Sequence, residues 1–506
     1  MKKKNLLKKR GAGILMPISS LPSPYGIGTL GKAAYDFVDS LVEAKQTYWQ
    51  VLPVGPTSYG DSPYQSFSAF AGNPYFIDLD ILIEEGFLSK SDVTGLNWGS
   101  DASNVDYAAI FNVRFDVLRK AYEGFLAKCK VRELEDFEDF KKKNKKWLDD
   151  YSLYMALKFK NGNREWLSWS EDLRFRKKKA LKKAKEEVAS DIDFWKFCQY
   201  EFFKQFMKLK NYANSKKIFI IGDIPLYVAL DSADVWANPK LFDLDEERRP
   251  RHVAGVPPDI FSADGQRWGN PIYDWKKMEE DGFDWWGRRM KAMSALYDVI
   301  RIDHFIGIVN YWAVPAENET AIDGEWVKGP GSKLTDVIKK SVGKSKIIAE
   351  DLGVITPPVR NLINECKWPG MKILQFAFDS DSKGEYLPQN YKDCNWVVYG
   401  GTHDNNTNIG YLNGVSEKQL KKIKKFLGLD EEATVIKVND EIIRLGYMSI
   451  ANTVIYQVQD LLRLDESARI NMPSTIGTNW RFRMVDEKLP KRVVKQLKSY
   501  VKLYNR

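Results

Sequence analysis

The chain has 506 residues and a formal net charge of +9, and 44% of its residues are hydrophobic and 13% aromatic. This length is more than one simple core needs, so we expect several domains or one domain with large insertions. The hydrophobic content excludes a disordered chain and favours a packed globular enzyme. Lysine-rich runs lie among helical spacings with acidic neighbours and without a nucleic-acid-binding signature, so we expect solvated helix faces and no nucleic-acid partner.

Cysteine usage and apolar runs indicate the compartment. Neither a CxxC pair nor a His-linked metal spacing is formed by the four cysteines Cys129, Cys198, Cys366 and Cys394. Free thiols fit a reducing cytosol. The basic N-terminal segment is not followed by the apolar stretch of a signal peptide, and no run approaches the ~18 apolar residues of a membrane span. We expect a cytoplasmic monomer or homodimer that needs no metal or cofactor and does not contact a membrane.

Eight segments have the apolar, β-branched character of strands, and most are followed by helical patterns. In chain order they are 13–18, 48–53, 218–228, 299–304, 346–350, 371–378, 396–402 and 454–461. This alternation predicts a parallel barrel or a doubly wound sheet. Eight strands close a barrel, whereas the sequence lacks the Gly-x-Gly-x-x-Gly motif of the doubly wound nucleotide-binding fold. The predicted fold class is therefore α/β, a (β/α)8 TIM barrel with large, mainly helical insertions.

Two connections are too long for a single crossover, which predicts the insertions. Residues 74–216 have a helical pattern. Five of them are spaced by three or four positions, which places them on one packed face of a helix: Trp195, Cys198, Phe202, Phe206 and Leu209. Residues 229–297 form a second insertion, and we expect its Gly/Pro-rich loop 255–262 to lie over the barrel mouth. Residues 1–506 would then form a single catalytic barrel with these two insertions.

Three predicted strands end on an acid, at Asp303, Glu350 and Asp404. The carboxyl ends of barrel strands are where such folds place their active sites. Two of the three histidines, His304 and His403, directly follow or precede these acids. Neutral imidazole is a good partner for hydroxyl groups, which favours a sugar-binding role. The alternative to an active site is that the three acids only form a salt-bridge network at the barrel mouth.

Asp303 and Glu350 suit the cleavage of glycosidic bonds, because retaining enzymes place an acid and a nucleophilic carboxylate ~5 Å apart. Neighbouring strands are ~4.8 Å apart, which allows this separation. Arg301 projects to the same side of its strand as Asp303 and can hold it ionised. The apolar residues before Glu350 would raise its pKa toward that of a general acid. Asp404 would stabilise an oxocarbenium-like transition state.

Several motifs resemble those of amylomaltases, the 4-α-glucanotransferases or disproportionating enzymes of the α-amylase clan. Their order along most of the chain is more specific than any single one of them. They are SSLPSPYGIG (19–28), WQVLP (49–53), SYGDSPYQ (58–65), GDIP (222–225), GVPPDIFS (255–262), GMKILQFAF (370–378), NWR (479–481) and the three acid-bearing strands.

The resemblance implies that Asp303 is the nucleophile, Glu350 the acid/base and Asp404 the transition-state stabiliser. It implies a retaining transferase that moves α-1,4-glucan segments of maltodextrins, starch or glycogen to the 4-hydroxyl of glucose or of another glucan. It also implies a set of substrate-binding residues, in which Tyr64 stacks at the cleaved glucose and Trp268 lines the acceptor side. The set is Tyr59, Asp61, Ser62, Tyr64, Asp223, Asp259, Trp268, Arg301, His304, His403 and Asn471.

Two alternatives remain at this point. The first is an α-glucan hydrolase of the same clan, but residues 222–225 lack the Asn-His pair usual on that strand, which favours a transferase. The second is a non-catalytic glucan-binding protein, and the presence of all three acids argues against it. Departures from the family pattern, such as Ile306 in place of arginine and Ser474 in place of glycine, do not touch the acids. They bear on product size rather than on the reaction.

Overall fold

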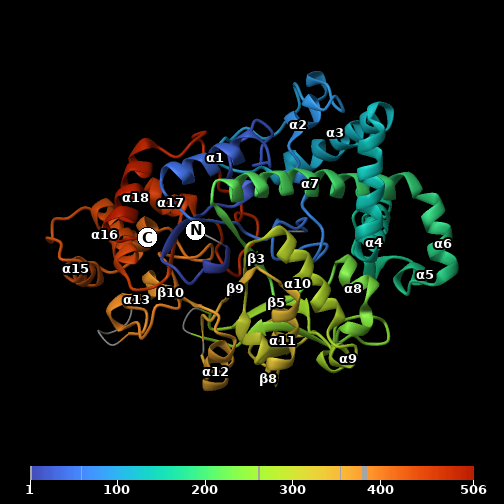
Figure 1. Cartoon of the computed structure of the whole chain (residues 1–506). Helices are drawn as coiled ribbons and strands as arrows, with labels where there is room; N and C mark the ends of the chain where they lie inside the picture. Colours follow the sequence, from blue (N-terminus) through green and yellow to red (C-terminus); the bar gives the residue numbers. More distant parts are fainter. Residues whose placement is uncertain (1–2, 59, 260–261, 354, 379–383) are drawn as a thin grey trace.

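The computed structural model describes residues 3–58, 60–259, 262–353, 355–378 and 384–506, and its centre is a ring of eight parallel strands (Figure 1). The backbone N–H of Ala349 donates to the carbonyl of Pro369 over 3.0 Å and closes the ring between its first and last strands. The predicted barrel is therefore confirmed. In sheet order its strands are β10 (Gly370–Ile373), β11 (Trp396–Tyr399), β12 (Thr453–Gln457), β1 (Gly11–Leu15), β2 (Tyr48–Gln50), β3 (Phe219–Ile224), β6 (Val299–Ile302) and β9 (Lys346–Ala349).

Each of the eight strands overlaps one of the eight predicted segments, and all of them end earlier than predicted. The predicted strand 371–378 stops at Ile373 and continues as helix α13 (Leu374–Ala377). The predicted strand 454–461 stops at Gln457 and continues as α17 (Val458–Leu462). Buried apolar residues continue past the strand end in both cases. An apolar run of this kind does not distinguish a buried strand from a buried helix.

Side chains fill the interior of the barrel. The Tyr399 hydroxyl donates to Oε1 of Gln50 over 2.9 Å and links β11 to β2 across the interior. Arg301 of β6 reaches toward β10, where its Nε atom lies 3.4 Å from the sulfur of Met371. Inward-facing residues therefore connect strands that are not neighbours in the sheet. The polar groups of Arg301 and Asp223 lie where the strands approach their carboxyl ends.

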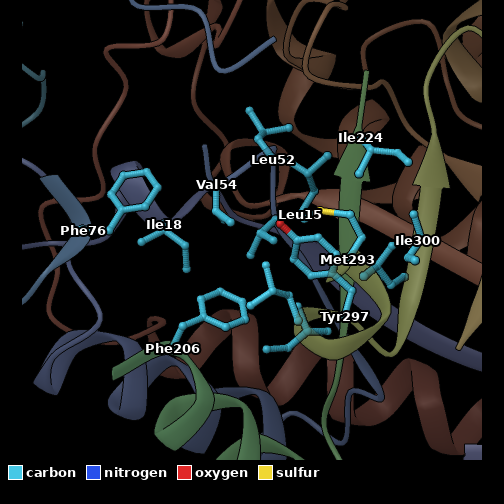
Figure 2. Close-up of a cluster of buried hydrophobic side chains, with 14 of the residues drawn as sticks. Leu15, Ile18, Leu52, Val54, Phe76, Phe206, Ile224, Met293, Tyr297 and Ile300 are labelled. Carbon is cyan, nitrogen blue, oxygen red and sulfur yellow. The ribbon is translucent and has the colours of Figure 1, made fainter. Parts of the chain in front are cut away.

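The outer surface of the barrel packs against helices. Figure 2 shows Ile224 of β3 and Ile300 of β6 close to Met293 of helix α10 (Asp284–Leu296) and to Tyr297. A Cβ atom at Gly222 would lie 2.2 Å from the ring of Tyr297. Only glycine allows the ring to pack this closely on β3. Alternation along the strand leaves the intervening residue, Asp223, facing the interior.

Further helices surround the barrel or lie in the connections between its strands. The α-helices are α1 (Lys32–Glu43), α8 (Ala233–Ala237), α9 (Trp275–Glu280), α11 (Ser332–Ser341), α12 (Pro357–Cys366), α14 (Asn408–Gly414), α15 (Glu417–Phe426), α16 (Val435–Met448) and α18 (Lys491–Leu503). Short 3-10 helices span Lys3–Asn5, Ile18–Ser20, Pro74–Phe76, Lys90–Asp92, Trp166–Ser168, Pro239–Leu241, Phe305–Ile308, Pro388–Asn390 and Glu466–Ala468.

The connection from β2 to β3 is helical. Figure 1 shows helices α4 (Val131–Lys160), α5 (Glu171–Arg174) and α6 (Lys178–Glu187) at the right edge of the molecule, away from the barrel strands. All five residues of the predicted packed face of 74–216 are buried. The division of the chain into a barrel and two insertions stays a prediction. The other main helices of this connection are α2 (Leu79–Glu84), α3 (Tyr107–Lys128) and α7 (Ala189–Ser215).

Helix α7 fixes the chain that follows β2. The buried amide of Gln199 accepts from the N–H of Gly72 over 2.7 Å and donates to its carbonyl over 2.9 Å. Gln205 makes the same pair of bonds with the backbone of Asp78. A Cβ atom at Gly72 would lie 1.9 Å from the ring of Phe202, so the close approach requires glycine. These contacts hold the base of the segment that carries residues 58–65.

A second, four-stranded antiparallel sheet was not predicted. Its strands come from two connections, the one before β6 and the one after it. Their burial is only partial, so they lack the continuous apolar pattern of the barrel strands. In sheet order they are β5 (Gln266–Pro271), β4 (His252–Val256), β7 (Asn310–Pro315) and β8 (Glu325–Lys328). Part of the predicted mouth loop 255–262 is thus strand, and its residues 260–261 lie outside the described residues.

The first and last segments of the described chain lie side by side (Figure 1). Arg506 donates from Nη1 to the carbonyl of Gly11, which begins β1, and Arg10 donates from Nε to the carbonyl of Tyr504. Among the described residues, no helix has both the length and the apolar character needed to cross a bilayer.

Candidate active site

A cavity of about 700 Å3 lies at the carboxyl ends of the barrel strands. One part of its wall comes from strand β5 of the second sheet, and another comes from residues 471–480, which follow β12. Its floor is formed by residues at the carboxyl ends of three strands. Asp303, His304 and Glu350 come directly after β6 and β9, and His403 and Asp404 lie in the loop after β11. The structure thus brings together the three predicted acids and both predicted histidines.

Arg301 joins two aspartates at the floor of the cavity. Its Nη1 atom lies 2.7 and 2.8 Å from the carboxylate oxygens of Asp223 and 2.8 Å from Oδ1 of Asp303. Burial disfavours the charged guanidinium, but the two carboxylates more than offset this and hold the pKa of Arg301 above its usual value. Burial also raises the pKa of Asp223, and Arg301 opposes that rise. Asp303 keeps 27% of its side chain exposed, so one oriented carboxylate faces the cavity.

Glu350 lies beside Asp303 on the neighbouring strand. Ile302 of β6 and Ala349 of β9 are register partners, so the two acids follow paired residues. The carboxyl oxygens of Glu350 accept from the backbone N–H of His304 over 2.6 Å and from that of Leu352 over 2.7 Å. Burial raises the pKa of Glu350 to about 7, although Arg301 and the two N–H groups oppose the rise. Glu350 is therefore a carboxyl group that can exchange a proton near neutral pH.

His304 has a left-handed backbone, with φ of 50° and ψ of 49°. This turn directs its N–H to Glu350 and places its imidazole edge-to-face with Trp268, with 4.8 Å between ring centroids. Burial lowers the pKa of His304 to about 4, so the ring is neutral near pH 7. Its Nε2 atom is buried and has no hydrogen-bond partner among the described residues. A ligand hydroxyl would supply that partner.

His403 and Asp404 form the opposite side of the floor. The Nε2 atom of His403 lies 3.2 Å from Oδ2 of Asp404, and the side-chain amide of Asn471 donates to Oδ1 over 2.6 Å. Burial acts to raise the pKa of Asp404, but His403 and Asn471 outweigh it and lower the pKa to about 2. Burial disfavours an imidazolium at His403, and Asp404 more than offsets this and raises its pKa. Asp404 thus presents a permanent negative charge to the cavity.

Tyr64 connects these two groups of residues. Its hydroxyl donates to Oδ2 of Asp223 over 2.9 Å and lies 3.5 Å from Nδ1 of His403. Its ring stacks on that of His403, with 5.0 Å between centroids and 15° between planes, and Trp480 tilts against it at 5.8 Å. The tyrosine ring forms a flat apolar edge of the cavity next to the acids, which suits the face of a sugar.

One side of the cavity depends on a link between distant segments. The amide of Gln65 donates to Oδ1 of Asn270 over 2.9 Å and to the carbonyl of Trp268 over 3.2 Å. These bonds hold β5 against the 58–65 segment, which also brings Ser62 to the cavity. The predicted set omitted Gln65, Asn270 and Trp480. Gln65 lies in the SYGDSPYQ motif and Trp480 in the NWR motif, so these two motifs could have identified both residues.

Some predicted substrate-binding residues lie elsewhere. Asp223 and Arg301 support the floor from below and do not line the cavity. Asp61 lines a separate hollow of about 550 Å3, where burial raises its pKa to about 6. Asp259 is exposed in the loop after β4 and does not line the main cavity. Tyr59 lies outside the described residues.

The cavity presents one oriented carboxylate, one carboxyl group that titrates near pH 7, one permanent anion and a neutral imidazole. Together they allow nucleophilic attack, proton transfer and stabilisation of a developing cation. Among the described residues, no group of three His, Cys, Asp or Glu side chains is placed to hold a metal ion.

Comparison with known proteins gives a consistent result over the whole length of the chain. A model of the 4-alpha-glucanotransferase family matches residues 16–488. The 4-alpha-glucanotransferase of Clostridium butyricum is 50% identical over 495 residues, which cover 97% of this chain and 100% of that protein. The 4-alpha-glucanotransferase of Thermus thermophilus is 45% identical over 485 residues, which cover 95% and 96% of the two chains.

A solved structure agrees with this result. Amylomaltase from Streptococcus agalactiae, in complex with acarbose, superposes with a TM-score of 0.94 at 42% sequence identity, and the match covers 98% of this chain and 100% of that one. The resemblance predicted from the motifs is therefore confirmed. The chain belongs to the 4-alpha-glucanotransferase family of enzymes.

Proposed function

We propose that this protein is a retaining 4-α-glucanotransferase that disproportionates α-1,4-glucans such as maltodextrins and starch or glycogen fragments. A donor glucan would be cleaved, and its segment would be passed to the 4-hydroxyl of glucose or of a second glucan. The observation that carries the proposal is the pairing of Asp303 with Glu350. One is an ion-paired carboxylate facing the cavity, and the other is a buried carboxyl group with a pKa of about 7 on the adjacent strand.

In the first step, a carboxylate oxygen of Asp303 attacks the anomeric carbon of the donor. The bond from that carbon to the O4 atom of the next glucose breaks, and Glu350 gives its proton to the leaving oxygen. The product is a glycosyl ester of Asp303 and a shortened glucan or free glucose. Asp404, with a pKa of about 2, remains ionised and stabilises the positive charge that develops on the sugar ring.

In the second step, the Glu350 carboxylate removes the proton from the 4-hydroxyl of an acceptor sugar. The acceptor oxygen bonds to the anomeric carbon, and the ester bond to Asp303 breaks. Two displacements restore the α-configuration and leave the number of glycosidic bonds unchanged. Strand β5 walls this side of the cavity with Trp268, which packs on His304 and limits the access of water to the ester.

The proposal is tested by incubating the purified protein with maltotriose alone and following products and reducing ends together. We expect glucose and a ladder of longer maltodextrins at a constant number of reducing ends. A rise in reducing ends with only shorter products would identify an α-glucan hydrolase instead. Unchanged maltotriose and unchanged longer maltodextrins would indicate a glucan-binding protein without catalytic activity.

A substitution tests the role of Asp303. Asp303→Asn keeps an oxygen for Arg301 but removes the nucleophile, so transfer should fall by several orders of magnitude while glucan binding persists. Asp264→Asn is the matched control, because Asp264 also lines the cavity but lies at its exposed rim. Transfer at the wild-type rate in Asp303→Asn would eliminate this mechanism.

A further inference from the structure

Arg469 lies behind the cavity and contacts two of the residues that form it. Its Nη2 atom donates to the backbone carbonyl of Asp404 over 2.6 Å, and its Nε atom donates to the backbone carbonyl of Asn471 over 2.7 Å. Arg469 does not line the cavity itself. It follows the 3-10 helix Glu466–Ala468, in the connection after β12, whereas Asp404 follows the neighbouring strand β11.

The geometry of one guanidinium therefore fixes the spacing of two chain segments. Its N–H groups form a rigid planar fork, so both carbonyl groups must stay at one separation and in one plane. Two further bonds cross the same junction. The N–H of Asn471 donates to the carbonyl of His403 over 3.1 Å, and its side-chain amide donates to the Asp404 carboxylate over 2.6 Å.

The same junction supports the base of the 471–480 wall. The N–H of Trp480 donates to the carbonyl of Ile470 over 2.6 Å, which closes this wall segment next to Arg469. Within the described part of the chain, the wall then contributes Asn471, Trp480 and residues 473–476 to the cavity. A shift at Arg469 would therefore move both Asp404 and the wall that faces it.

We infer that Arg469 is a positioning residue for glucan transfer, which sets the Asp404 carboxylate at the place where positive charge develops on the donor sugar. The inference rests on the proposed function, because it assigns Asp404 to the transition state. A positioning residue of this kind acts mainly on kcat, since the donor is bound by many other groups of the cavity. A displacement of about 1 Å at such a group lowers the rate by as much as about 100-fold.

Two substitutions and a matched control test this inference in the full chain, with maltotriose as substrate. Arg469→Gln removes the cationic fork and should lower kcat by about 10- to 100-fold while KM stays within about threefold. Arg469→Lys keeps the charge but has no fork, so its kcat should lie between those of Arg469→Gln and the wild type. Arg492→Gln is the control, because Arg492 also donates to a backbone carbonyl, that of Leu461, away from the cavity.

Hydrogen exchange gives a readout that does not depend on activity. The amide of Asn471 should exchange faster in Arg469→Gln than in the wild type and should be unchanged in Arg492→Gln. Unchanged exchange at Asn471, an unchanged kcat, or an equal loss of kcat in the control would each overturn the inference. Wild-type protein that leaves maltotriose unchanged would refute the proposed function instead, and the exchange experiment would still decide whether Arg469 holds this junction.

Discussion

Glu350 is predicted to set the alkaline limit of transfer activity. Its burial raises the pKa from 4.5 to about 7. The proposed first step needs the protonated form, so kcat/KM should be nearly constant between about pH 5 and about pH 6.5 and should fall about tenfold per pH unit above about pH 7. The assay is the initial rate of glucose release from maltotriose at low substrate concentration, where the pH profile reports groups of the free enzyme.

The raised pKa of Glu350 also makes the free energy of unfolding depend on pH. Between pH 4.5 and about 7 the folded chain holds a proton on Glu350 that the unfolded chain has released, so the free energy of unfolding falls as the pH rises through this window. A shift of about 2.5 units corresponds to a loss of about 3 kcal/mol, which is complete above about pH 7.

Glu350→Gln tests the effect of Glu350 on the rate and its effect on stability in separate measurements. The variant should lose roughly 10²- to 10⁴-fold in rate, and its residual activity should have no alkaline limb. Its free energy of unfolding relative to wild type, measured in urea, should rise by about 3 kcal/mol from about pH 5 to about pH 8. Any pH-independent effect of the new amide on the free energy of unfolding cancels, because only the change between the two pH values is compared. An alkaline limb at the same pH in Glu350→Gln, or a pH-independent difference in stability, would refute the reasoning.

Three further substitutions test the surroundings of the site. Arg301→Met should lower the free energy of unfolding by about 3–5 kcal/mol, measured in urea, because it leaves carboxylates without their cation. Trp268→Ala should open the acceptor side to water, so that reducing ends increase during incubation with maltotriose. Gly72→Ala should destabilise by about 1–3 kcal/mol, because the methyl group meets the Phe202 ring, whereas Gly414→Ala, with nothing within 4 Å, should be nearly neutral in thermal unfolding.

The barrel and the floor of its cavity were predictable because both follow from local sequence. Eight buried strands need continuous β-branched runs, and the acids stand where these runs end. The placement of Asp303 beside Glu350 follows from strand order alone, since β6 and β9 are neighbours. The buried face of α7 was predictable for the same reason, because its spacing of three and four is written in consecutive residues.

The cavity wall was not predictable from local sequence. The strands of the second sheet are short and half exposed, and their pairing joins segments on both sides of β6. The link between Gln65 and Asn270 spans 205 positions and depends on two side-chain amides with no distinctive pattern. The left-handed backbone of His304 was not indicated by a glycine, and a histidine adopts this conformation only in a small minority of cases. It is held by its N–H bond to Glu350, which only the folded site supplies.

The charge of Asp303 connects the two steps of the proposed reaction. Its carboxylate is one of the groups that raise the pKa of Glu350. Formation of the glycosyl ester removes that charge, while Arg301 stays in place and continues to lower the pKa. The pKa of Glu350 should therefore fall after it has given its proton to the leaving group, so that more of it is in the carboxylate form that the second step needs as its base.

Asp303→Asn reproduces this change of charge without a substrate. At ~5 Å and an effective dielectric constant of ~20, loss of the charge should lower the pKa of Glu350 by up to about 2 units. The measurement is the pH dependence of the free energy of unfolding, compared between Asp303→Asn and the same variant that also carries Glu350→Gln. The pH window in which this difference in free energy changes should end at about pH 5 in the Asp303→Asn background, whereas it ends at about pH 7 when Asp303 is present. A window that still ends near pH 7 would show that Asp303 does not control the protonation of Glu350, because burial alone would then account for its pKa.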